Sequence, residues 1–450
     1  MTRRPLAFAL ALLVLPLGAQ AEDLLQSYEL ARNSDPQFAA AEAGRLATRE
    51  GAVQTRATFL PQIGGSVGAS YSDTTSELGS GFEVSDGGGG RSYGLSVDQS
   101  ILDFGNIARH RSQLSLSEAA DFQLEAAGDS LITRTSAAYF NVLVALETLS
   151  AAEAQETALK KQFDFADKRL EVGLAPITDV HEARAQYDRA RANTIVTRNA
   201  LEDAYRALEE ITGKDVRALK SLPQDFQPEL PSSLDVDGWV KTATDNNPAL
   251  KAKELELRSA EAGVDSARAG HLPSIGLRAT YGNNRSLFDG NVGPTGIDSS
   301  DTSTVGLTVS IPIFSGGATQ SQVRQALAQR DVTGDQLDQQ RRALVRNTRN
   351  AYQTLVAGIS EVEARKAAVF SARSAYEASQ VGLEVGTRTV LDVLNNQQTL
   401  FNAEREYALS RYNFLQNRLL LEQAAGTLDV DDLQDVNRQL TTDAISASVP

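Results

Sequence analysis

Side chains that could perform chemistry are scarce in this sequence. Its 450 residues include no cysteine and only three histidines, which are His110, His181 and His271. Thiol catalysis, disulfide frameworks and cysteine-based zinc sites are therefore excluded, and a histidine-rich metal site is not expected. The segment Gly64-Gly65-Ser66-Val67-Gly68 matches the G-x-S-x-G pattern of a nucleophile elbow. It lies in an alternating, strand-like stretch with no helix after it, so we expect no catalysis there.

The sequence also lacks the motifs that bind nucleotide cofactors. It contains neither a P-loop nor a dinucleotide-binding fingerprint. We therefore predict no cofactor and no enzymatic activity, and any energy source must belong to a partner.

The charge balance excludes another class of function. The chain has 58 Asp and Glu against 43 Lys and Arg, which gives a formal net charge of -15. Such a chain has no cationic excess to neutralise phosphates, so no nucleic-acid partner is predicted. With 41% hydrophobic and 22% charged residues, the chain can bury a core and is not disordered overall.

The first residues have the composition of a signal peptide. Arg3 and Arg4 precede an apolar stretch from Leu6 to Leu17, and Ala19-Gln20-Ala21 fits a small-residue cleavage site. Residues 1–21 are therefore predicted to be removed on export. No later stretch reaches the roughly 18 apolar residues that a spanning helix needs. Soluble periplasmic, secreted and outer-membrane fates all remain open at this point.

The sequence repeats itself at an offset of about 212 residues. Matched pairs include Pro36 with Pro248, Leu60-Pro61 with Leu272-Pro273, Val172-Gly173 with Val385-Gly386, and Gly213 with Gly426. We predict a first repeat at residues 22–213, a proline-containing linker at 214–237, a second repeat at 238–426 and a C-terminal tail at 427–450.

Each repeat shows the same order of hydrophobic periods. A helix, a β-hairpin, a very long helix, a turn and a returning helix are expected in turn. The first helices are predicted at 24–58 and 239–270, the hairpins at 62–101 and 274–313, the long helices at 105–173 and 317–386, and the returning helices at 178–212 and 391–425. Each hairpin is expected to close through a loop of about 20 residues rich in Gly, Ser and Asp, which in the first repeat includes Gly87 to Gly90.

The long helices carry apolar residues at a spacing of seven. Leu355, Val362, Val369, Tyr376 and Leu383 form this stripe in the second repeat. A helix of this length would extend about 100 Å, and a heptad stripe over that distance favours coiled-coil packing. The alternative is an ordinary core face.

Four strands per chain cannot close a transmembrane barrel, because the smallest such barrels have eight. An isolated sheet with an apolar face would also leave unpaired edges, so oligomerisation is implied. Two chains would supply eight strands and three would supply twelve, and the wider ring is the better conduit. The predicted fold class is therefore mainly α with a β-barrel: a short outer-membrane barrel continued by a long α-helical tunnel.

Several motifs resemble the TolC family of outer-membrane factors. They are Leu-Pro-Gln-Ile before the first strand, the segment from Val172 to Asp188, and the segment from Val385 to Leu394. The resemblance covers essentially the whole mature chain. It implies a homotrimer in outer-membrane lipid, with a twelve-stranded barrel and a periplasmic tunnel of twelve helical rods.

The same resemblance implies partners and a function. The tunnel would dock on a periplasmic adaptor and an inner-membrane transporter of RND or ABC type, and would serve efflux of drugs and other small molecules. Type I protein secretion is the alternative, because the sequence does not separate the two. A coiled-coil surface adhesin is a remote alternative, since adhesin strands would lie only at the C-terminus.

The resemblance also assigns residues to a gate at the periplasmic tip. Arg388 matches a gate arginine, and Asp179, with Thr178 beside it, matches its carboxylate partner. A bidentate pair of this kind between neighbouring coils would hold the closed state. The family's gate tyrosine is replaced here by Leu383. The alternative is a solvated pair at two helix ends.

Asp392 matches an acidic position that lines the narrow entrance of TolC-like tunnels. In a trimer it would form a ring that attracts cations. A second acidic position three residues later is Asn395 here, so a weaker block by multivalent cations is expected. Alternatively, Asp392 only stabilises a helix N-terminus.

The two tip turns are candidates for adaptor docking. Glycine allows another helical hairpin to approach closely, or serves only to make the turn. The residues concerned are Gly173, Leu174, Ala175, Pro176, Gly386 and Thr387.

Overall fold

The computed structural model describes residues 23–78, 82–223, 225–231, 235–286 and 299–444. The predicted signal peptide, residues 1–21, lies outside the described residues. The chain forms two compact units, each assembled from segments that are distant in sequence. The described residues of 40–126 and 248–343 form the sheet unit, and those of 23–39, 127–247 and 344–444 form the hairpin unit.

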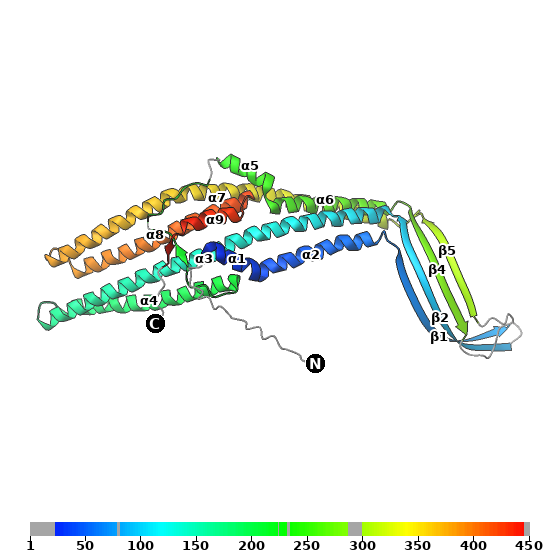
Figure 1. Cartoon of the computed structure of the whole chain (residues 1–450), viewed down its shortest axis with the longest axis horizontal. Coiled ribbons are helices and arrows are strands. Elements are labelled where there is room, and N and C mark those ends of the chain that lie inside the picture. The colour runs from blue at the N-terminus through cyan, green and yellow to red at the C-terminus, as the bar shows by residue number, and fades with distance from the viewer. Residues whose placement is uncertain (1–22, 79–81, 224, 232–234, 287–298, 445–450) are drawn as a thin grey trace, which may run out of the picture. The chain divides into compact units, whose positions relative to one another are not determined.

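The sheet unit is built on four antiparallel strands in the order β1-β2-β4-β5 (Figure 1). The strands are β1 (Gln62–Leu78), β2 (Phe82–Leu102), β4 (Ser274–Ser286) and β5 (Ser299–Ser310). Helix α2 (Pro36–Ala57) precedes β1, and α6 (Pro248–Ala269) precedes β4. Helix α3 (Phe104–Glu171) follows β2, and α7 (Ala318–Glu384) follows β5.

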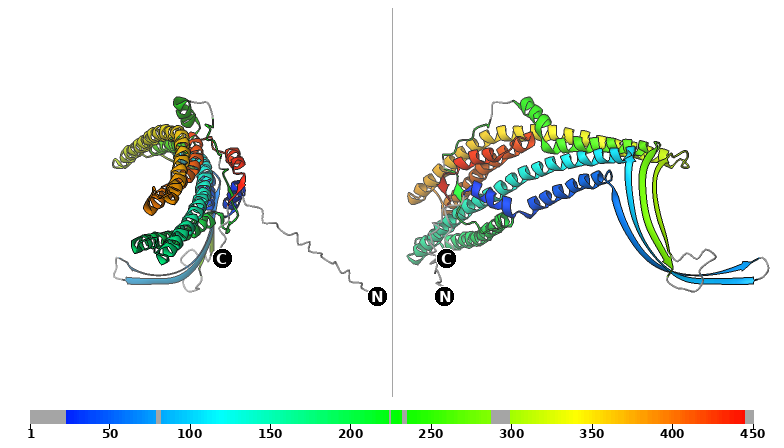
Figure 2. Two further views of the ribbon diagram at one scale, coloured as in Figure 1. Left: turned by 90° about the vertical axis from the view of Figure 1, so that its left-hand side faces the viewer. Right: turned by 45° about the vertical axis from the view of Figure 1, so that its right-hand side comes forward.

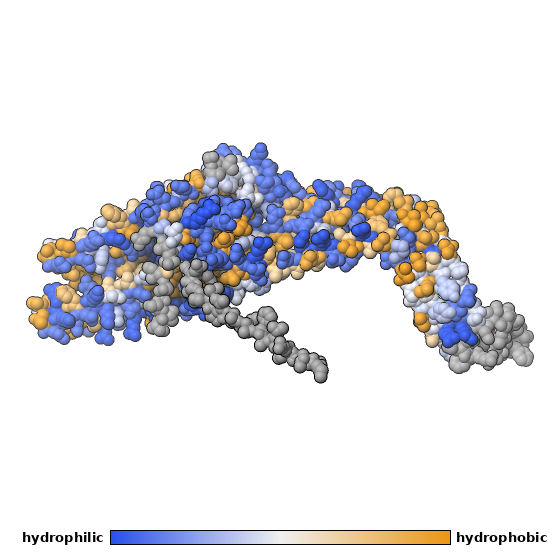
Figure 3. Space-filling view, viewed as in Figure 1, coloured by the Kyte–Doolittle hydropathy of each residue, from blue (hydrophilic) through white to orange (hydrophobic). Residues whose placement is uncertain are grey.

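The two faces of this sheet differ in polarity because successive side chains of a strand point to opposite faces. One face exposes large apolar side chains, among them Val67, which is 91% exposed, and Val305, which is 76% exposed. In Figure 3 the hydrophobic colour gathers over the part of the sheet next to the helices. The other face carries Ser, Thr and Gly, and an ion pair of 2.5 Å joins Arg278 Nε to Asp98 Oδ1 there.

The strands of the first hairpin run further than the sequence predicts. Gly87 to Gly90, expected in a long loop, lie within β2, where Gly87 pairs with Asp73 and Gly90 with Ser70. The prediction of a loop was wrong because the hydrogen bonds of an antiparallel ladder come from the backbone, which glycine supplies as well as any residue. Part of the corresponding connection in the second hairpin, residues 287–298, lies outside the described residues.

The helix before each β-hairpin is broken in two, although one continuous helix was predicted. Helix α1 (Leu24–Ser34) ends before Asp35-Pro36, and α5 (Val236–Asn246) ends before Asn247-Pro248. The residue before proline is displaced from helical geometry by the proline ring. Accordingly, ψ is 117° at Asp35 and 120° at Asn247.

The hairpin unit contains two long helical hairpins. The distal part of α3 turns into α4 (Ile177–Thr212), and the distal part of α7 turns into α8 (Val390–Ala425). Within each helical hairpin the two helices lie side by side (Figures 1 and 2). Helix α9 (Val430–Gln439) and a two-stranded sheet of β3 (Lys220–Ser221) and β6 (Thr442–Asp443) complete the unit.

The core of this unit draws on all four hairpin helices. Leu355 and Val362 of the heptad stripe are buried, and their first-repeat counterparts Val142 and Leu149 are buried as well. Other fully buried members are Tyr139, Leu208, Tyr412, Leu415 and Leu419. Further along the stripe, Val369, Tyr376 and Leu383 are only half-buried.

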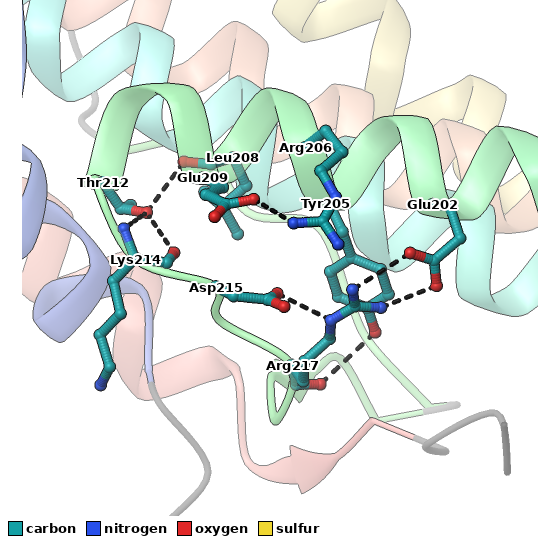
Figure 4. Close-up of polar contacts among 9 residues, drawn as sticks. All are labelled: Glu202, Tyr205, Arg206, Leu208, Glu209, Thr212, Lys214, Asp215 and Arg217. Carbon is teal, nitrogen blue, oxygen red and sulfur yellow. Dashed lines mark hydrogen bonds and ion pairs between the residues drawn. The ribbon is translucent and has the colours of Figure 1, made fainter.

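Polar contacts fix the linker after the first repeat (Figure 4). Helix α4 ends at Gly213, whose φ of 67° is the left-handed conformation suited to glycine. Arg217 then reaches back to α4, where its guanidinium donates 2.7 and 3.1 Å hydrogen bonds to the two carboxylate oxygens of Glu202. Further along, the Tyr139 hydroxyl donates to Lys220 O at 2.9 Å and accepts from Lys220 N at 2.8 Å. The linker is thus tied to both α3 and α4.

Candidate functional site

The two tip turns have the same backbone construction. Gly173 and Gly386 have φ of 74° and 78°, which an L side chain adopts only with strain. Their N–H groups donate to Leu170 O at 2.9 Å and Leu383 O at 3.2 Å. A Cβ atom at either glycine would find no atom within 4 Å. The glycines are therefore required by the turn itself, and the space around them is open.

Apolar side chains stand exposed around both turns. Leu174 is 68% exposed, and Val172 and Val385 are 68% and 69% exposed. The first turns of the helices that follow carry Ile177 and Leu391, which are 58% and 45% exposed. Sequence reasoning named Leu174 but missed the other four, because an apolar residue near a turn looks the same in sequence whether it is buried or exposed.

The gate residues predicted from the sequence do not meet within one chain. Asp179 is half-buried in the first turn of α4, Thr178 is exposed, and Arg388 is exposed after the second turn. Among the described residues, no ion pair joins Arg388 to Asp179. Instead, Arg388 lies over Gly382, where an added Cβ would stand 2.6 Å from Arg388 Cγ. Gly382 was missed because only the fold reveals this approach.

Asp392 forms a capping box at the start of α8. Its Oδ2 accepts from both the N–H and the hydroxyl of Thr389 at 2.9 Å, and the Thr389 hydroxyl accepts from Asp392 N at 3.2 Å. The N–H and the hydroxyl of Thr389 hold the pKa of the Asp392 carboxyl below its ordinary value. These contacts therefore fit the alternative interpretation, in which Asp392 stabilises the N-terminus of a helix. The T-x-x-D spacing of a capping box was a signal that could have identified Thr389.

The two helical hairpins also contact each other. Leu394 of α8 packs against Leu159 of α3 and Ala190 of α4. Nearby, Gln155 Nε2 donates a 2.6 Å hydrogen bond to Gln398 Oε1. Movement of one hairpin against the other would separate these contacts.

The described residues hold no group of His, Cys, Asp and Glu side chains that could bind a metal ion. Within the same part of the chain, each helix is too short or too polar to cross a membrane.

The fold of this chain is shared with outer membrane channels of known structure. The Campylobacter jejuni CmeC outer membrane channel superposes with a TM-score of 0.78 at 20% identity, covering 93% of this chain and 90% of that one. A membrane protein from Pseudomonas aeruginosa gives a TM-score of 0.76 at 20% identity, with 90% and 94% covered. The predicted fold class is confirmed: the chain is mostly helical, with a four-stranded sheet, as in TolC-like channels.

The chain belongs to the outer membrane efflux protein family, whose model matches residues 27–214 and 239–427. It is similar to the outer membrane protein TolC of Escherichia coli, with 35% identity over 97% of this chain and 89% of that protein. It is also similar to the alkaline protease secretion protein AprF of Pseudomonas aeruginosa, with 30% identity over 95% and 89%. The resemblance drawn from the sequence is confirmed, and the chain is an outer-membrane exit duct.

Proposed function

We propose that the chain forms a homotrimeric exit duct for the efflux of drugs and other small molecules. The observation that carries this proposal is the family match over both repeats, together with a sheet that ends in two edges. Strands β1 and β5 are the outer strands of the four-stranded sheet, and its apolar face is exposed. Three copies joined edge to edge would give twelve strands in a closed ring, with the apolar face toward lipid and the polar face toward the lumen.

The proposed duct requires partners, because the sequence has no motif for an energy source. A periplasmic adaptor would bind the tip turns, and an inner-membrane transporter of RND or ABC type would load the duct. The exposed apolar side chains beside Gly173 and Gly386 support docking there. They would be covered by the adaptor's helices while the glycines allow close approach.

Deletion and complementation in the native bacterium test this function. Without the chain, cells should accumulate a fluorescent efflux dye and become more sensitive to dyes and detergents, and the gene on a plasmid should reverse both effects. Unchanged accumulation and sensitivity would reject efflux as the function.

A type I secretion duct is the second candidate. It is favoured by the similarity to AprF and to the proteases secretion protein PrtF of Dickeya chrysanthemi, which is 29% identical over 93% of this chain. The same deletion strain distinguishes the two candidates. Loss of a specific protein from the culture medium with unchanged dye accumulation would indicate secretion.

We further propose that Arg388 and Asp179 close the tip between neighbouring protomers of the trimer, with Thr178 beside them. Arg388 is exposed and Asp179 is half-buried, and the two do not pair with each other within one chain. Both side chains are therefore accessible for such contacts. Asp392 would face the axis as a ring of three carboxylates, and its lowered pKa keeps it charged.

A further inference from the structure

Two arginines lie directly opposite each other on the apolar face of the sheet. Arg91 of β2 and Arg285 of β4 are register partners, and both are exposed. Strand alternation puts them on the same face as Val67 and Leu95. Ala69 and Ser299 complete this row on β1 and β5, so only small side chains flank the two guanidinium groups.

This arrangement is unfavourable unless an anion binds. Side chains directly opposite in an antiparallel pair have Cβ atoms about 5 Å apart, and like charges there destabilise the sheet. Neither arginine has an ion-pair partner among the described residues. Asp301, one row away, already accepts hydrogen bonds from Asn283 Nδ2 at 2.7 Å and Tyr281 Oη at 3.3 Å. Asp73 of β1 lies on the same face, four residues beyond Ala69 and therefore two rows away from the arginines.

The arginine row lies at the height of a membrane interface. Along β4, ten residues separate Arg285 from Ile275, whose partner Val309 lies at the end of the sheet next to the helices. At 3.4 Å per residue this is about 34 Å along the strand, and a tilt of about 40° reduces it to about 26 Å of height. Outer-membrane barrels have an apolar band about 25 Å tall. Because the helices lie on the periplasmic side in the proposed duct, the arginines mark the outer edge of the band.

Tyrosines mark the same boundary. Tyr71, Tyr93 and Tyr281 are 72%, 48% and 43% exposed on the apolar face, within two rows of the arginines. Aromatic residues concentrate where hydrocarbon meets headgroups, because one end of the ring is apolar and the other is polar.

We propose that Arg91 and Arg285 bind a phosphate group of a phosphorylated glycolipid in the outer leaflet. Paired guanidinium groups match phosphate oxygens through charge-assisted bidentate hydrogen bonds. The acyl chains of the lipid would lie against the apolar rows toward the helices, and its sugar would lie near the tyrosines. The inference rests on the orientation of the sheet in the proposed duct.

Binding of diphosphoryl lipid A to the purified full-length protein in detergent tests this proposal. Native mass spectrometry should show lipid A bound to wild type. Affinity should fall at least about tenfold in Arg91→Gln/Arg285→Gln, because charge-assisted bonds to phosphate are lost. Arg91→Lys/Arg285→Lys should bind with intermediate affinity, because charge remains without the bidentate geometry.

The matched control is Arg324→Gln/Arg342→Gln, which removes the same charge from two exposed α7 arginines without an ion pair among the described residues. It should bind lipid A like wild type. Equal loss in this control, or unchanged binding by Arg91→Gln/Arg285→Gln, would overturn the proposal. So would displacement of lipid A by millimolar inorganic phosphate, which would indicate a free-anion site instead.

Two further readouts separate folding and channel function from lipid binding. Without lipid, the melting temperature of Arg91→Gln/Arg285→Gln should be no lower than that of wild type, because a like-charge pair is removed. Lipid A should raise the melting temperature of wild type only. Conductance in planar bilayers of phosphatidylethanolamine should be the same for both proteins. A wild-type protein that does not conduct would contradict the duct itself, whereas lipid A binding tests only the arginine pair.

Discussion

At the scale of single residues, the gate is the sharpest expectation. Arg388→Ala together with Asp179→Ala should raise the single-channel conductance in planar bilayers, because the contacts proposed to close the tip are lost. Arg324→Ala, a charge change on an exposed helix face, is the control and should leave conductance unaltered. If the double variant conducts like wild type, the two residues do not form the gate.

The proposed carboxylate ring makes a separate prediction. Asp392→Asn should weaken block of the channel by a trivalent cation added on the tip side, because three charges around the axis are removed. Thr389→Val disrupts the same capping box but keeps the carboxylate, so it should retain the block. Persistent block in Asp392→Asn would place the cation site elsewhere.

A buried carboxyl in α8 predicts a pH dependence of stability. Glu422 is 3% exposed. Its Oε1 accepts a 3.2 Å hydrogen bond from Arg418 Nε, whereas Oε2 has no partner among the described residues. Burial, and after it the charge of Asp432, raises the pKa of Glu422 to about 7. The folded state therefore holds this proton more tightly than the unfolded chain, whose glutamates titrate near 4.3.

It follows that the Glu422 contribution to stability is largest at acidic pH and declines as pH rises from about 4.5 to above 7. Glu422→Gln should remove this decline and raise the free energy of unfolding at pH 8 by about 1–3 kcal/mol. Denaturant unfolding in detergent at pH 5 and pH 8 measures the effect. Glu209→Gln, at the equivalent but 35% exposed position of the first repeat, should change neither value. A lower stability of Glu422→Gln at pH 8 would contradict the assignment.

At the scale of elements, two glycines with similar φ angles should respond differently to substitution. Gly426, which ends α8, has φ of 68°, and a Cβ there would stand 2.6 Å from Asn247 Cα. Gly386 has φ of 78° and open space around it. Gly386→Ala should therefore cost only the backbone strain, about 1 kcal/mol. Gly426→Ala should cost clearly more, because backbone atoms must shift; equal losses in thermal unfolding would contradict this.

The sequence predicted the elements well where local signals determine them. The return helix expected at 178–212 is α4, Ile177–Thr212, because a turn glycine and a proline precede it and Gly213 ends it. The break at Asp35-Pro36 was missed because the apolar period continues across it. The strand through Gly87 was missed because residue composition does not report backbone pairing.

The site was less accessible to sequence reasoning for a related reason. Motif spacing identified the turn glycines, which the backbone angles require. The packing of Arg388 over Gly382 and the contact between Gln155 and Gln398 depend on two segments meeting in space. A pair between neighbouring protomers is likewise a property of the assembly, and one chain contains only half of it.

At the scale of the whole molecule, the account depends on a conducting assembly. The sheet has one apolar face and two edge strands, and the chain is built of two similar halves. Both features fit a ring that separates an aqueous lumen from lipid. The most direct measurement is conductance after adding the purified, detergent-extracted protein to planar bilayers, with its mass determined in the same detergent. A trimer with discrete conductance steps is predicted, and a stable monomer that never conducts would contradict the proposed duct.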